Sequence, residues 1–489
     1  MRAAIIALSA MLSVLYPAHS FAQMKKINVP EKNVGNKQCT FAVEHTGPGS
    51  GRFIERIYNQ QDVDNFHAKY GDCTDFIGVL LITDKSNNFS TATANSSAIN
   101  SLQGLAQIHS ATYIYIENTQ LTNLKGFNNL QNVSNFTISS NPNLPSLDGL
   151  QSLNTVSSFT LQSNPSLTSL SGLNSLTSAS LTIKDNNKLT SLTGLDSLAS
   201  VYDMDIEDNQ ALINFEGLTK LTKINSLTLR NNAVFANFKG AAQLQHISTL
   251  SLYVNPVFEG FTGLDNLTDI GTLTAEYNPK WGDFEGLSKV NSIEHIVLNN
   301  NQQLTSFSGL DQLQDVNTLE LTNNPSIENI DALSQTLGAY NQIDIENNPK
   351  LSSIKGLKGN LGIQAADGYN GDLTVVNNPS LTSLDGLDSM VKVEGSILLK
   401  NNAALTSIKA LSHLQRIGKD IQITDTALTS LDGLEHLELP SSSADHHLIL
   451  QDNSGLSDCS AVCHLSATDG YVQLIGENGT CQQSLDACH

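Results

Sequence analysis

The sequence predicts a mainly β solenoid of about 15 to 16 coils with a disulfide-bonded cap at each end. Two ladders of residues that share a period of 22 to 24 residues carry this prediction, and all six cysteines lie outside the repeated region. The 489-residue chain has 39% hydrophobic but only 15% charged residues, which is too apolar for disorder and too uncharged for coiled coils. One elongated body built from a repeat is therefore favoured over several globular domains.

Residues 1–22 have the features of a cleaved signal peptide. Arg2 precedes an apolar stretch at residues 3–16 that is too short to span a bilayer, and residues 20–22 form a small-x-small cleavage site. No cysteine follows that site and no later apolar run reaches about 18 residues, so we expect neither a lipid anchor nor a membrane span. We expect a secreted protein, extracellular or at the cell surface, with the periplasm as an alternative.

The cysteines fall into two groups, which in an exported protein indicates disulfides. Cys39 and Cys73 lie in an N-terminal cap, residues 23–78, and we expect them to pair. The other four lie in a Cys-rich C-terminal cap, residues 457–489, and allow three pairings. Their spacings of three, seventeen and six residues disfavour a zinc site.

A local argument narrows the C-terminal pairing. If Cys459 and Cys463 share one helical turn, each should bond outward, to Cys481 or to Cys488. The prediction is thus two disulfides that join the first two cysteines of this cap to the last two.

Between the caps, residues 79–456 repeat one pattern. A small residue recurs at steps of 22 to 24 residues, with one step of 30, at Gly104, Gly126, Gly149, Gly172, Gly194, Gly217, Gly240, Gly263, Gly286, Gly309, Ala332, Gly356, Gly386, Ala410 and Gly433. An Asn recurs in phase with it, at Asn118, Asn141, Asn164, Asn186, Asn209, Asn232, Asn255, Asn278, Asn301, Asn324, Asn348, Asn378 and Asn402. Two ladders with one period indicate a solenoid.

Each repeat also carries an alternating apolar pair, such as Leu227 and Leu229, which predicts a short strand with one buried face. The following Asn, often succeeded by Pro as at Asn164, turns the chain between faces. Since one strand cannot bury its apolar face alone, successive coils should stack at about 4.8 Å. The stacked Asn side chains can then satisfy backbone groups at the corner.

The motif Leu-Thr-Ser-Leu-x-Gly-Leu-x-x-Leu at residues 189–198, with Leu-x-Leu-x-x-Asn-Pro at 319–325, resembles the receptor L-domain type of leucine-rich repeat. Residues 62–82 are similar to the family's first cap, and residues 459–488 to the terminal cap of its secreted bacterial members. The resemblance implies a leucine-rich-repeat solenoid, a bacterial origin and a binding role. It implies no receptor signalling, because the chain lacks a Cys-rich module, a membrane span and a kinase.

Outward residues of the predicted strands form a ribbon that supplies candidate ligand-binding groups. Carboxylates there could bind calcium or a basic protein surface, and tyrosines could stack on sugars or anchor a protein. An ordinary solvated strand face explains both equally well. The candidates are Asp203, Asp205, Glu207, Glu276, Asp344 and Glu346, with Glu320 nearby, and Tyr113, Tyr115, Tyr253 and Tyr277.

Two insertions interrupt the spacing between the small residue and the next strand, which is normally ten residues but takes seventeen after Gly356 and fifteen after Gly433. They lie three coils, or about 14 Å, apart in the same segment of the repeat, so we expect them to border one shallow cleft. Tolerated surface insertions are the alternative. The candidate recognition residues there are Tyr369, Asp367, His446 and His447.

No catalytic motif stands in the chain. A Ser/Lys pair at Ser352 and Lys355 falls in the regular repeat and needs no catalytic role. The formal net charge of -21 disfavours nucleic acid and anionic lipid as partners. We expect a monomeric, non-catalytic binding or adhesion protein for an extracellular protein or glycan, with no cofactor unless calcium binds. The alternatives are a calcium-dependent polysaccharide-acting solenoid enzyme and an ice-binding or structural envelope protein.

Overall fold

The computed structural model describes residues 38–41, 43–45, 51–84, 98–336, 338–358, 360–366, 368–439, 447–466 and 472–488. From Gln38 onward the chain forms one compact unit. The predicted signal segment and the loop residues Asp367 and His446 lie outside the described residues. Within the described part, no helix is both long and apolar enough to cross a bilayer.

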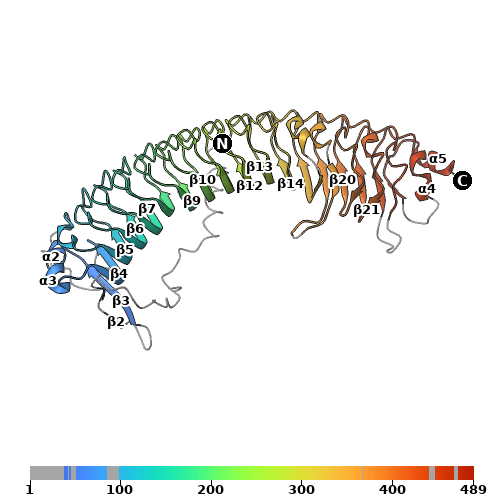
Figure 1. Cartoon of the computed structure of the whole chain (residues 1–489). Helices are drawn as coiled ribbons and strands as arrows, with labels where there is room; N and C mark the ends of the chain where they lie inside the picture. The colour runs from blue at the N-terminus through green and yellow to red at the C-terminus, as the bar shows by residue number, and fades with distance from the viewer. Residues whose placement is uncertain are drawn as a thin grey trace. The chain divides into compact units, whose positions relative to one another are not determined.

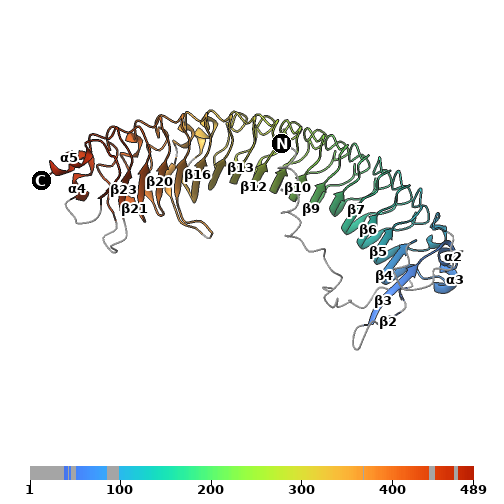
Figure 2. The ribbon, with the colours of Figure 1, turned by 180° about the vertical axis from the view of Figure 1, so that it is seen from behind.

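Parallel strands, one from each coil, form the main sheet along one side of the coils, and turns with short 3-10 helices form the opposite side (Figure 1, Figure 2). Seventeen strands make up this row, because strands at both caps extend the predicted 15 to 16 coils in the same register. They are β4 (Asp75–Thr83), β5 (Ser110–Glu117), β6 (Asn132–Ser139), β7 (Thr155–Gln162), β8 (Ser178–Lys184), β9 (Ser200–Glu207), β10 (Lys223–Arg230), β11 (His246–Tyr253), β12 (Asp269–Glu276), β13 (Ser292–Asn299), β14 (Thr318–Thr322), β16 (Gln342–Glu346), β18 (Leu373–Val376), β20 (Ile397–Lys400), β22 (Ile421–Thr424), β23 (Leu448–Gln451) and β24 (Val472–Ile475). The fold is a mainly β leucine-rich-repeat solenoid.

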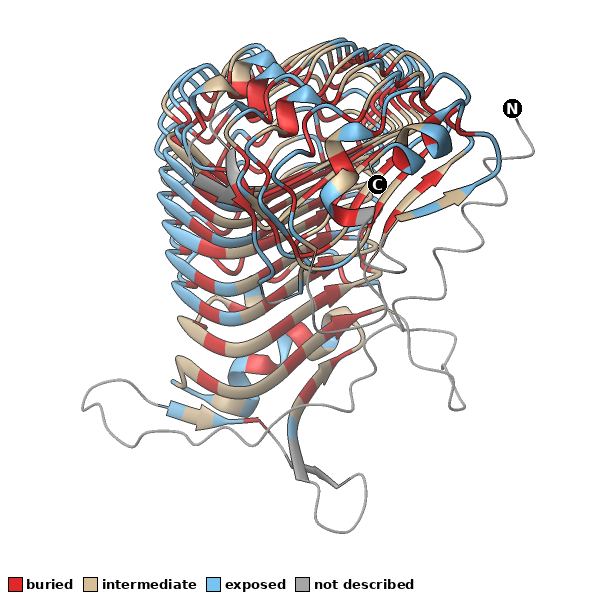
Figure 3. Ribbon diagram, turned by 90° about the vertical axis from the view of Figure 1, so that its right-hand side faces the viewer, coloured by how far each residue is buried: buried red, intermediate tan, exposed pale blue. Residues whose placement is uncertain are grey.

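The alternating apolar pairs lie inside the coils, as predicted. Leu227 of β10 stands opposite Met204 of β9 and Leu250 of β11, and all three are buried. Figure 3 shows the resulting bands of buried residues continuing from coil to coil. Each strand therefore completes the apolar face of its neighbours, which is why a single repeat is not a stable unit.

The Asn ladder satisfies the backbone at each corner from inside the coil. The Asn164 side chain is fully buried and donates to the carbonyl oxygens of Ile138 at 3.0 Å and Gln162 at 3.1 Å. Its Oδ1 accepts from the backbone N–H of Asn141 at 3.1 Å. Its Nδ2 also donates to Asn186 Oδ1 on the following coil at 3.2 Å, so one amide joins three successive coils, as the stacked Asn prediction requires.

The predicted ladder is wrong by one residue at its beginning. Thr119 is the buried residue that joins Asn141, with its hydroxyl donating to Asn141 Oδ1 at 2.7 Å. Asn118 occupies the preceding turn position with φ +55°. The Thr119 hydroxyl takes the place of the Asn amide, so an Asn pattern does not include this position. The predicted ladder also ends at Asn402, whereas Thr426, Asn453 and Asn478 continue it toward the C-terminal cap.

The small-residue ladder has two structural forms. Most members resemble Gly263, which has φ +102° and whose added Cβ would lie 2.5 Å from the carbonyl oxygen of Phe238. Four members, Gly104, Ala332, Gly356 and Ala410, instead lie in short 3-10 helices, where φ is not positive. Close packing still favours glycine at Gly356, whose added Cβ would lie 1.9 Å from the carbonyl oxygen of Ile330. Those helices are η2 (Gln103–Leu105), η3 (Asp331–Gln335), η4 (Lys355–Leu357) and η5 (Lys409–Leu411).

A second, smaller parallel sheet lies in the C-terminal third of the solenoid. It joins β15 (Gly338–Tyr340), β17 (Asn360–Ile363), β19 (Lys392–Val393) and β21 (Arg416–Ile417) in that order. The chain runs from these strands into β16, β18, β20 and β22 of the main sheet. The longer coils of this region thus contribute a strand to each sheet.

The N-terminal cap packs against β4. Both β1 (Gln38–Thr40) and β3 (Gly51–Ile57) pair in parallel with β4, and β2 (Val43–His45) pairs with β3. The helices α2 (Gln60–Asp64) and α3 (Phe66–Tyr70) follow, and the predicted Cys39–Cys73 disulfide is confirmed.

The C-terminal cap contains η6 (Ser460–Val462), α4 (Cys463–Ser466), β24 and α5 (Cys481–Asp486). Cys459 bonds to Cys481 and Cys463 bonds to Cys488, so the outward pairing is confirmed and the quartet holds no zinc. The sequence separations of 22 and 25 residues each correspond to about one coil. These bridges hold the end of the solenoid where no further coil covers it.

Aromatic rings replace leucines in the middle of the core and contact one another across coils. Phe261 lies 6.0 Å from Phe238, 5.6 Å from Trp281 and 5.9 Å from Phe284, measured between ring centroids. The series continues in both directions, to Phe215 and to Phe307. This aromatic column fills the interior behind the strands that carry the candidate site.

Candidate functional site

The outward side chains of the main sheet stand in rows, because equivalent residues of successive strands pair in register. The central row consists of Tyr115, Thr137, Thr160, Thr182, Asp205, Thr228, Ser251, Thr274, Val297, Glu320, Asp344, Thr374, Leu398, Gln422 and Ile449. A second outward row lies two residues further along each strand and includes Lys184, Glu207, Arg230, Tyr253 and Glu276. Most of the predicted carboxylates and Tyr253 belong to these two rows.

The β8–β12 cluster consists of Lys184, Asp205, Glu207, Arg230, Tyr253 and Glu276. Lys184 Nζ lies 2.8 Å from Glu207 Oε2 on the next strand. On the other side of Glu207, the Arg230 guanidinium lies 4.5 Å from the centroid of the Tyr253 ring. Cation and ring attract each other because the face of the ring is electron-rich. The structure therefore brings three predicted residues, Glu207, Tyr253 and Glu276, into one continuous row with Lys184 and Arg230.

Partial burial shapes the electrostatics of this cluster. Burial raises the pKa of Asp205 above its ordinary value, and Glu207 raises it further, whereas Lys184 and Arg230 lower it. Burial also raises the pKa of Glu276, which Arg230 partly offsets. The hydrogen bond to Glu207 raises the pKa of Lys184. Asp205 and Glu276 are thus held in an environment that disfavours their charge, a cost that a Ser or Thr at the same positions would not carry.

A second acidic group lies on β14 and β16. Glu320 and Asp344 are neighbours in the central row, and Glu346 follows Asp344 on the same face. Burial raises the pKa of Glu320, and the Asp344 charge raises it further. Burial and Asp344 likewise raise the pKa of Glu346. Asp203, by contrast, is an exposed residue at the beginning of the β9 face and has no role in this geometry.

The raised carboxylate pKa values predict a pH dependence of stability. A carboxyl whose folded pKa exceeds its unfolded value destabilises the fold at pH above both values, and this cost disappears as the pH falls below the unfolded value. We expect the melting temperature to rise by about 1 °C between pH 7 and pH 5, with the rise reduced in Glu320→Gln. Differential scanning calorimetry of the two proteins measures this. Exposed Glu294 on β13 provides the control, since a Glu294→Gln variant that flattened the profile equally would contradict the assignment.

The predicted tyrosines do not form one platform. Tyr113 and Tyr115 lie half-buried on β5, several coils before β9, where burial and the neighbouring Tyr113 raise the pKa of Tyr115. Tyr253 lies on β11 beside Arg230. Tyr277 lies outside the strand, in the turn after β12, with φ +57°. The expectation that Tyr277 is a strand residue is therefore wrong, because β12 ends at Glu276.

Tyr369 folds back over the sheet on a short hairpin. Ala366 and Tyr369 exchange backbone hydrogen bonds across its turn. The Tyr369 ring stacks on His295 of β13, with centroids 5.6 Å apart and planes at 18°, and its hydroxyl lies 3.3 Å from His295 Nδ1. Thr318, the outward residue beside His295, is fully buried. Tyr369 thus turns toward the middle of the sheet and contacts His295, not His447 of the second insertion.

The hairpin should depend on this ring contact. We expect Tyr369→Ala to accelerate amide exchange at Ala366 and residue 369 by about tenfold, while the free energy of unfolding falls by no more than about 1.5 kcal/mol. Hydrogen–deuterium exchange with mass spectrometry measures the exchange rate of the amides at residues 366 and 369. His295→Ala should give the same pattern and exposed Tyr202→Ala should not. Unchanged exchange in both ring variants would mean that the hairpin is held by its backbone alone.

The carboxylates do not form a metal site in the described part of the chain, where no group of three His, Cys, Asp or Glu side chains is arranged to hold a metal ion. Asp203, Asp205 and Glu207 alternate along one face of β9, so their attachment points are about 7 Å apart. That spacing is too wide for one calcium ion without further ligands.

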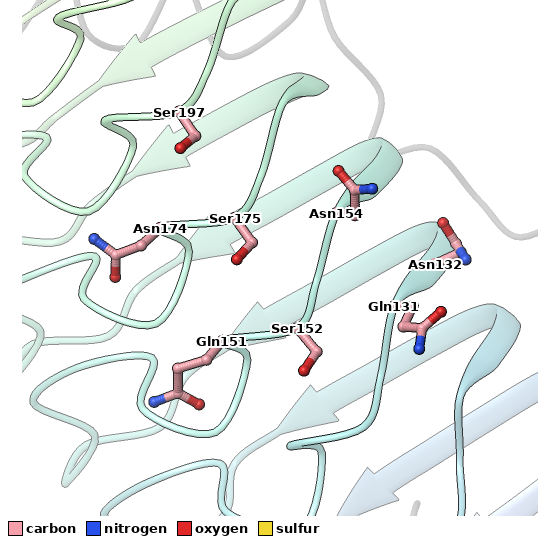
Figure 4. Close-up of a pocket in the computed structure, with 8 residues that line it drawn as sticks. All are labelled: Gln131, Asn132, Gln151, Ser152, Asn154, Asn174, Ser175 and Ser197. Atoms are coloured by element: carbon pink, nitrogen blue, oxygen red, sulfur yellow. The ribbon is translucent and has the colours of Figure 1, made fainter.

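A polar groove that sequence reasoning missed lies on the side of the coils that leads into β6–β9 (Figure 4). Its volume is about 570 Å³, and it is lined by Gln131, Asn132, Gln151, Ser152, Asn154, Asn174, Ser175 and Ser197. Several of these amides serve the repeat itself, since Gln151 Oε1 accepts from Gly149 N at 3.0 Å and Asn174 Oδ1 from Gly172 N at 3.3 Å. The signal in the sequence is a polar residue two positions after the ladder glycine, and it is explained by the turn.

Solved structures that are similar to this chain include an internalin and a leucine-rich-repeat protein. No protein-family model matches the chain, and neither does any curated protein. An internalin from Listeria monocytogenes matches with 17% identity and a TM-score of 0.38, over 78% of this chain and 89% of that chain. A leucine-rich-repeat protein from Leptospira interrogans matches with 17% identity and a TM-score of 0.36, over 72% of this chain and 78% of that chain. The coils and their register, independently of these likenesses, make the chain a leucine-rich-repeat solenoid closed by disulfides near both ends.

Proposed function

We propose that this chain is a secreted or cell-surface, non-catalytic binding protein that recognises an extracellular protein through the β8–β12 cluster. The observation that carries the proposal is the row from Lys184 to Glu276, in which charged and aromatic side chains are held half-buried on the strand face. The two nearest positions of this row on each side of the cluster are uncharged, namely Ser139 and Gln162 before it and Asn299 and Thr322 after it, and the next positions beyond them are Glu117 and Glu346. Stacking of the coils therefore needs no charge at these positions. Partly desolvated charges and a Tyr–Arg pair are typical of interface anchors.

The alternatives receive less support from these side chains. A polysaccharide lyase needs a cation to stabilise the sugar carbanion, but Lys184 is paired with Glu207 and Arg230 is stacked on Tyr253. An ice-binding surface needs an unbroken Thr row, which Asp205, Glu320 and Asp344 interrupt. The binding screen below also tests the two remaining alternatives, a glycan partner and a structural role in the cell envelope.

Further properties belong to the same proposal. Disulfides in both caps support export to an oxidising compartment. The repeat motif supports the receptor L-domain type and a bacterial source, and the net charge of -21 supports a monomer without nucleic-acid partners.

The test is a binding screen against extracellular-protein and glycan arrays, with and without calcium. We expect a protein hit that is independent of calcium and is weakened at least about tenfold by Arg230→Ala and by Glu276→Gln. Matched controls remove the same charges from exposed sites away from the strands, as Lys289→Ala and Glu285→Gln. Hits that resist the cluster variants, or that are glycans only, would refute the proposed site.

A further inference from the structure

The turn after each strand contains one residue in the left-handed conformation. Fifteen non-glycine residues of the described chain have positive φ, and each immediately precedes the corner position of its coil. Thirteen of them are Asn or Asp, which tolerate the left-handed conformation best among non-glycine residues, or Ser, which has a small side chain. The two exceptions are Val254, with φ +57°, and Tyr277, with φ +57°.

These two exceptions are neighbours in space. Val254 N donates to the carbonyl oxygen of Glu276 at 2.9 Å, and Tyr277 N donates to that of Asn299 at 3.0 Å. The same hydrogen bond recurs at the turns of the flanking coils, so Val254 and Tyr277 occupy equivalent positions on adjacent coils, about 4.8 Å apart. The ladder on both sides therefore enforces the left-handed conformation on a β-branched and on an aromatic residue.

Neither side chain is explained by the core. Val254 is 44% exposed and Tyr277 is 43% exposed. Val234, 40% exposed, and Ile213, 48% exposed, follow the corner residues Asn232 and Asn209 of the two preceding coils by two and four residues. These four make up half of the eight large exposed apolar residues in the described part of the chain. Backbone strain combined with exposed apolar surface stabilises nothing in the isolated protein, so it points to an interaction.

Val254 and Tyr277, here called the apolar edge, directly follow residues of the β8–β12 cluster. Tyr253 and Glu276 are the strand residues that immediately precede Val254 and Tyr277. Two coils before Val254, the equivalent turn position is Asp208, beside Glu207. The two cations of the cluster are already engaged, by Glu207 and by the Tyr253 ring. The apolar edge is thus bordered by carboxylates within a chain of net charge -21.

We propose that Val254 and Tyr277 form the apolar anchor of the binding surface, and that the partner is a protein segment with an apolar centre flanked by Lys or Arg. This inference rests on the proposed function and specifies which residues and which partner chemistry complete it. An apolar centre would cover Val254 and Tyr277, and basic flanks would meet Glu207, Asp208 and Glu276. Apolar anchors surrounded by polar contacts and complementary charge are the usual arrangement at protein interfaces.

The left-handed conformation of Val254 and Tyr277 allows a test that distinguishes a binding role from a structural one. Replacing Val254 and Tyr277 with Asn, the residue of neighbouring coils, relieves the conformational cost and removes the exposed apolar surface. We expect the melting temperature of V254N/Y277N to rise by about 1 to 3 °C. Binding should fall while stability rises, which is the trade-off expected of residues selected for function.

The probe is an array of 15-residue peptides with a central Leu-Phe pair and Lys or Arg flanks, read by fluorescence anisotropy against the full chain. Matched peptides carry Glu flanks or a Ser-Ser centre. We expect the basic apolar peptides to bind best and V254N/Y277N to weaken them at least tenfold, with V391N, at a 40% exposed Val elsewhere, unchanged. No preference for the basic apolar peptides, or equal binding by V254N/Y277N, overturns the inference, and so does a melting temperature that falls. Protein binding lost in Arg230→Ala but kept in V254N/Y277N would leave the proposed function standing and remove this anchor.

Discussion

Replacing Phe261 with Ala should lower the free energy of unfolding by about 3 to 5 kcal/mol. Phe261 is fully buried, and its ring lies within about 6 Å of those of Phe238, Trp281 and Phe284. Removal creates a cavity in a column whose neighbouring rings are fixed by adjacent coils and cannot collapse into it. The lost apolar burial and the lost ring contacts add to the same result.

Urea denaturation measures this effect, with circular dichroism reporting unfolding of the whole solenoid and Trp281 fluorescence reporting the surroundings of that ring. Since Trp281 contacts Phe261, its fluorescence should report the local loss directly. Phe261→Leu is the control, because a leucine is the residue at the equivalent position of many other coils and should cost about 1.5 kcal/mol or less. A Phe261→Ala protein as stable as the Leu variant would show that the aromatic column is not tightly packed.

Replacing Asn164 with Ala should be nearly as destabilising, at about 3 kcal/mol. The change leaves the backbone N–H of Asn141 and the carbonyl oxygens of Ile138 and Gln162 without their buried partner. A buried backbone group without a hydrogen bond costs about 1 to 3 kcal/mol, and no water reaches a fully buried corner to replace the amide. Because the ladder joins successive coils, we also expect unfolding to become less cooperative.

Thermal unfolding with and without urea tests this, and the chain offers two comparisons. Asn164→Thr should recover part of the loss, since Thr119 and Thr426 occupy the same position in other coils. The exposed Asn154→Ala variant should stay within about 0.5 kcal/mol of the parent protein. If Asn154→Ala and Asn164→Ala were equally mild, the ladder would not be a source of stability.

Register explains which parts of the candidate site were predictable. A period of 22 to 24 residues fixes which residues are equivalent, so the central outward row from Tyr115 to Ile449 follows from the sequence alone. The place of a residue within one repeat is less well predicted where only one residue type, such as an Asn or a Tyr, indicates it. The sequence therefore predicts Asn118 as the corner residue although Thr119 is buried there, and Tyr277 as a strand residue although it lies in the turn.

Contacts between distant coils were not predictable in this way. Tyr369 and His295 are separated by 74 residues, and no periodic signal relates an insertion to the coil that it folds back on. The Arg230–Tyr253 pair is different, because both residues follow from the register and only their rotamers required the structure.

The sequence by itself determined the solenoid, most of its corner Asn ladder and the Cys39–Cys73 disulfide, because each depends on residues repeated at a fixed spacing or confined to a chain end. It limited the C-terminal disulfides to two pairings, and the structure decided between them. The tertiary structure alone decided which outward residues share a partly buried environment, where the Tyr369 hairpin lies, and that Val254 and Tyr277 occupy strained, exposed turns. The physical reason is that repeat identity sets equivalent positions. Burial, backbone conformation and side-chain partners at one position depend on all the coils stacked around it.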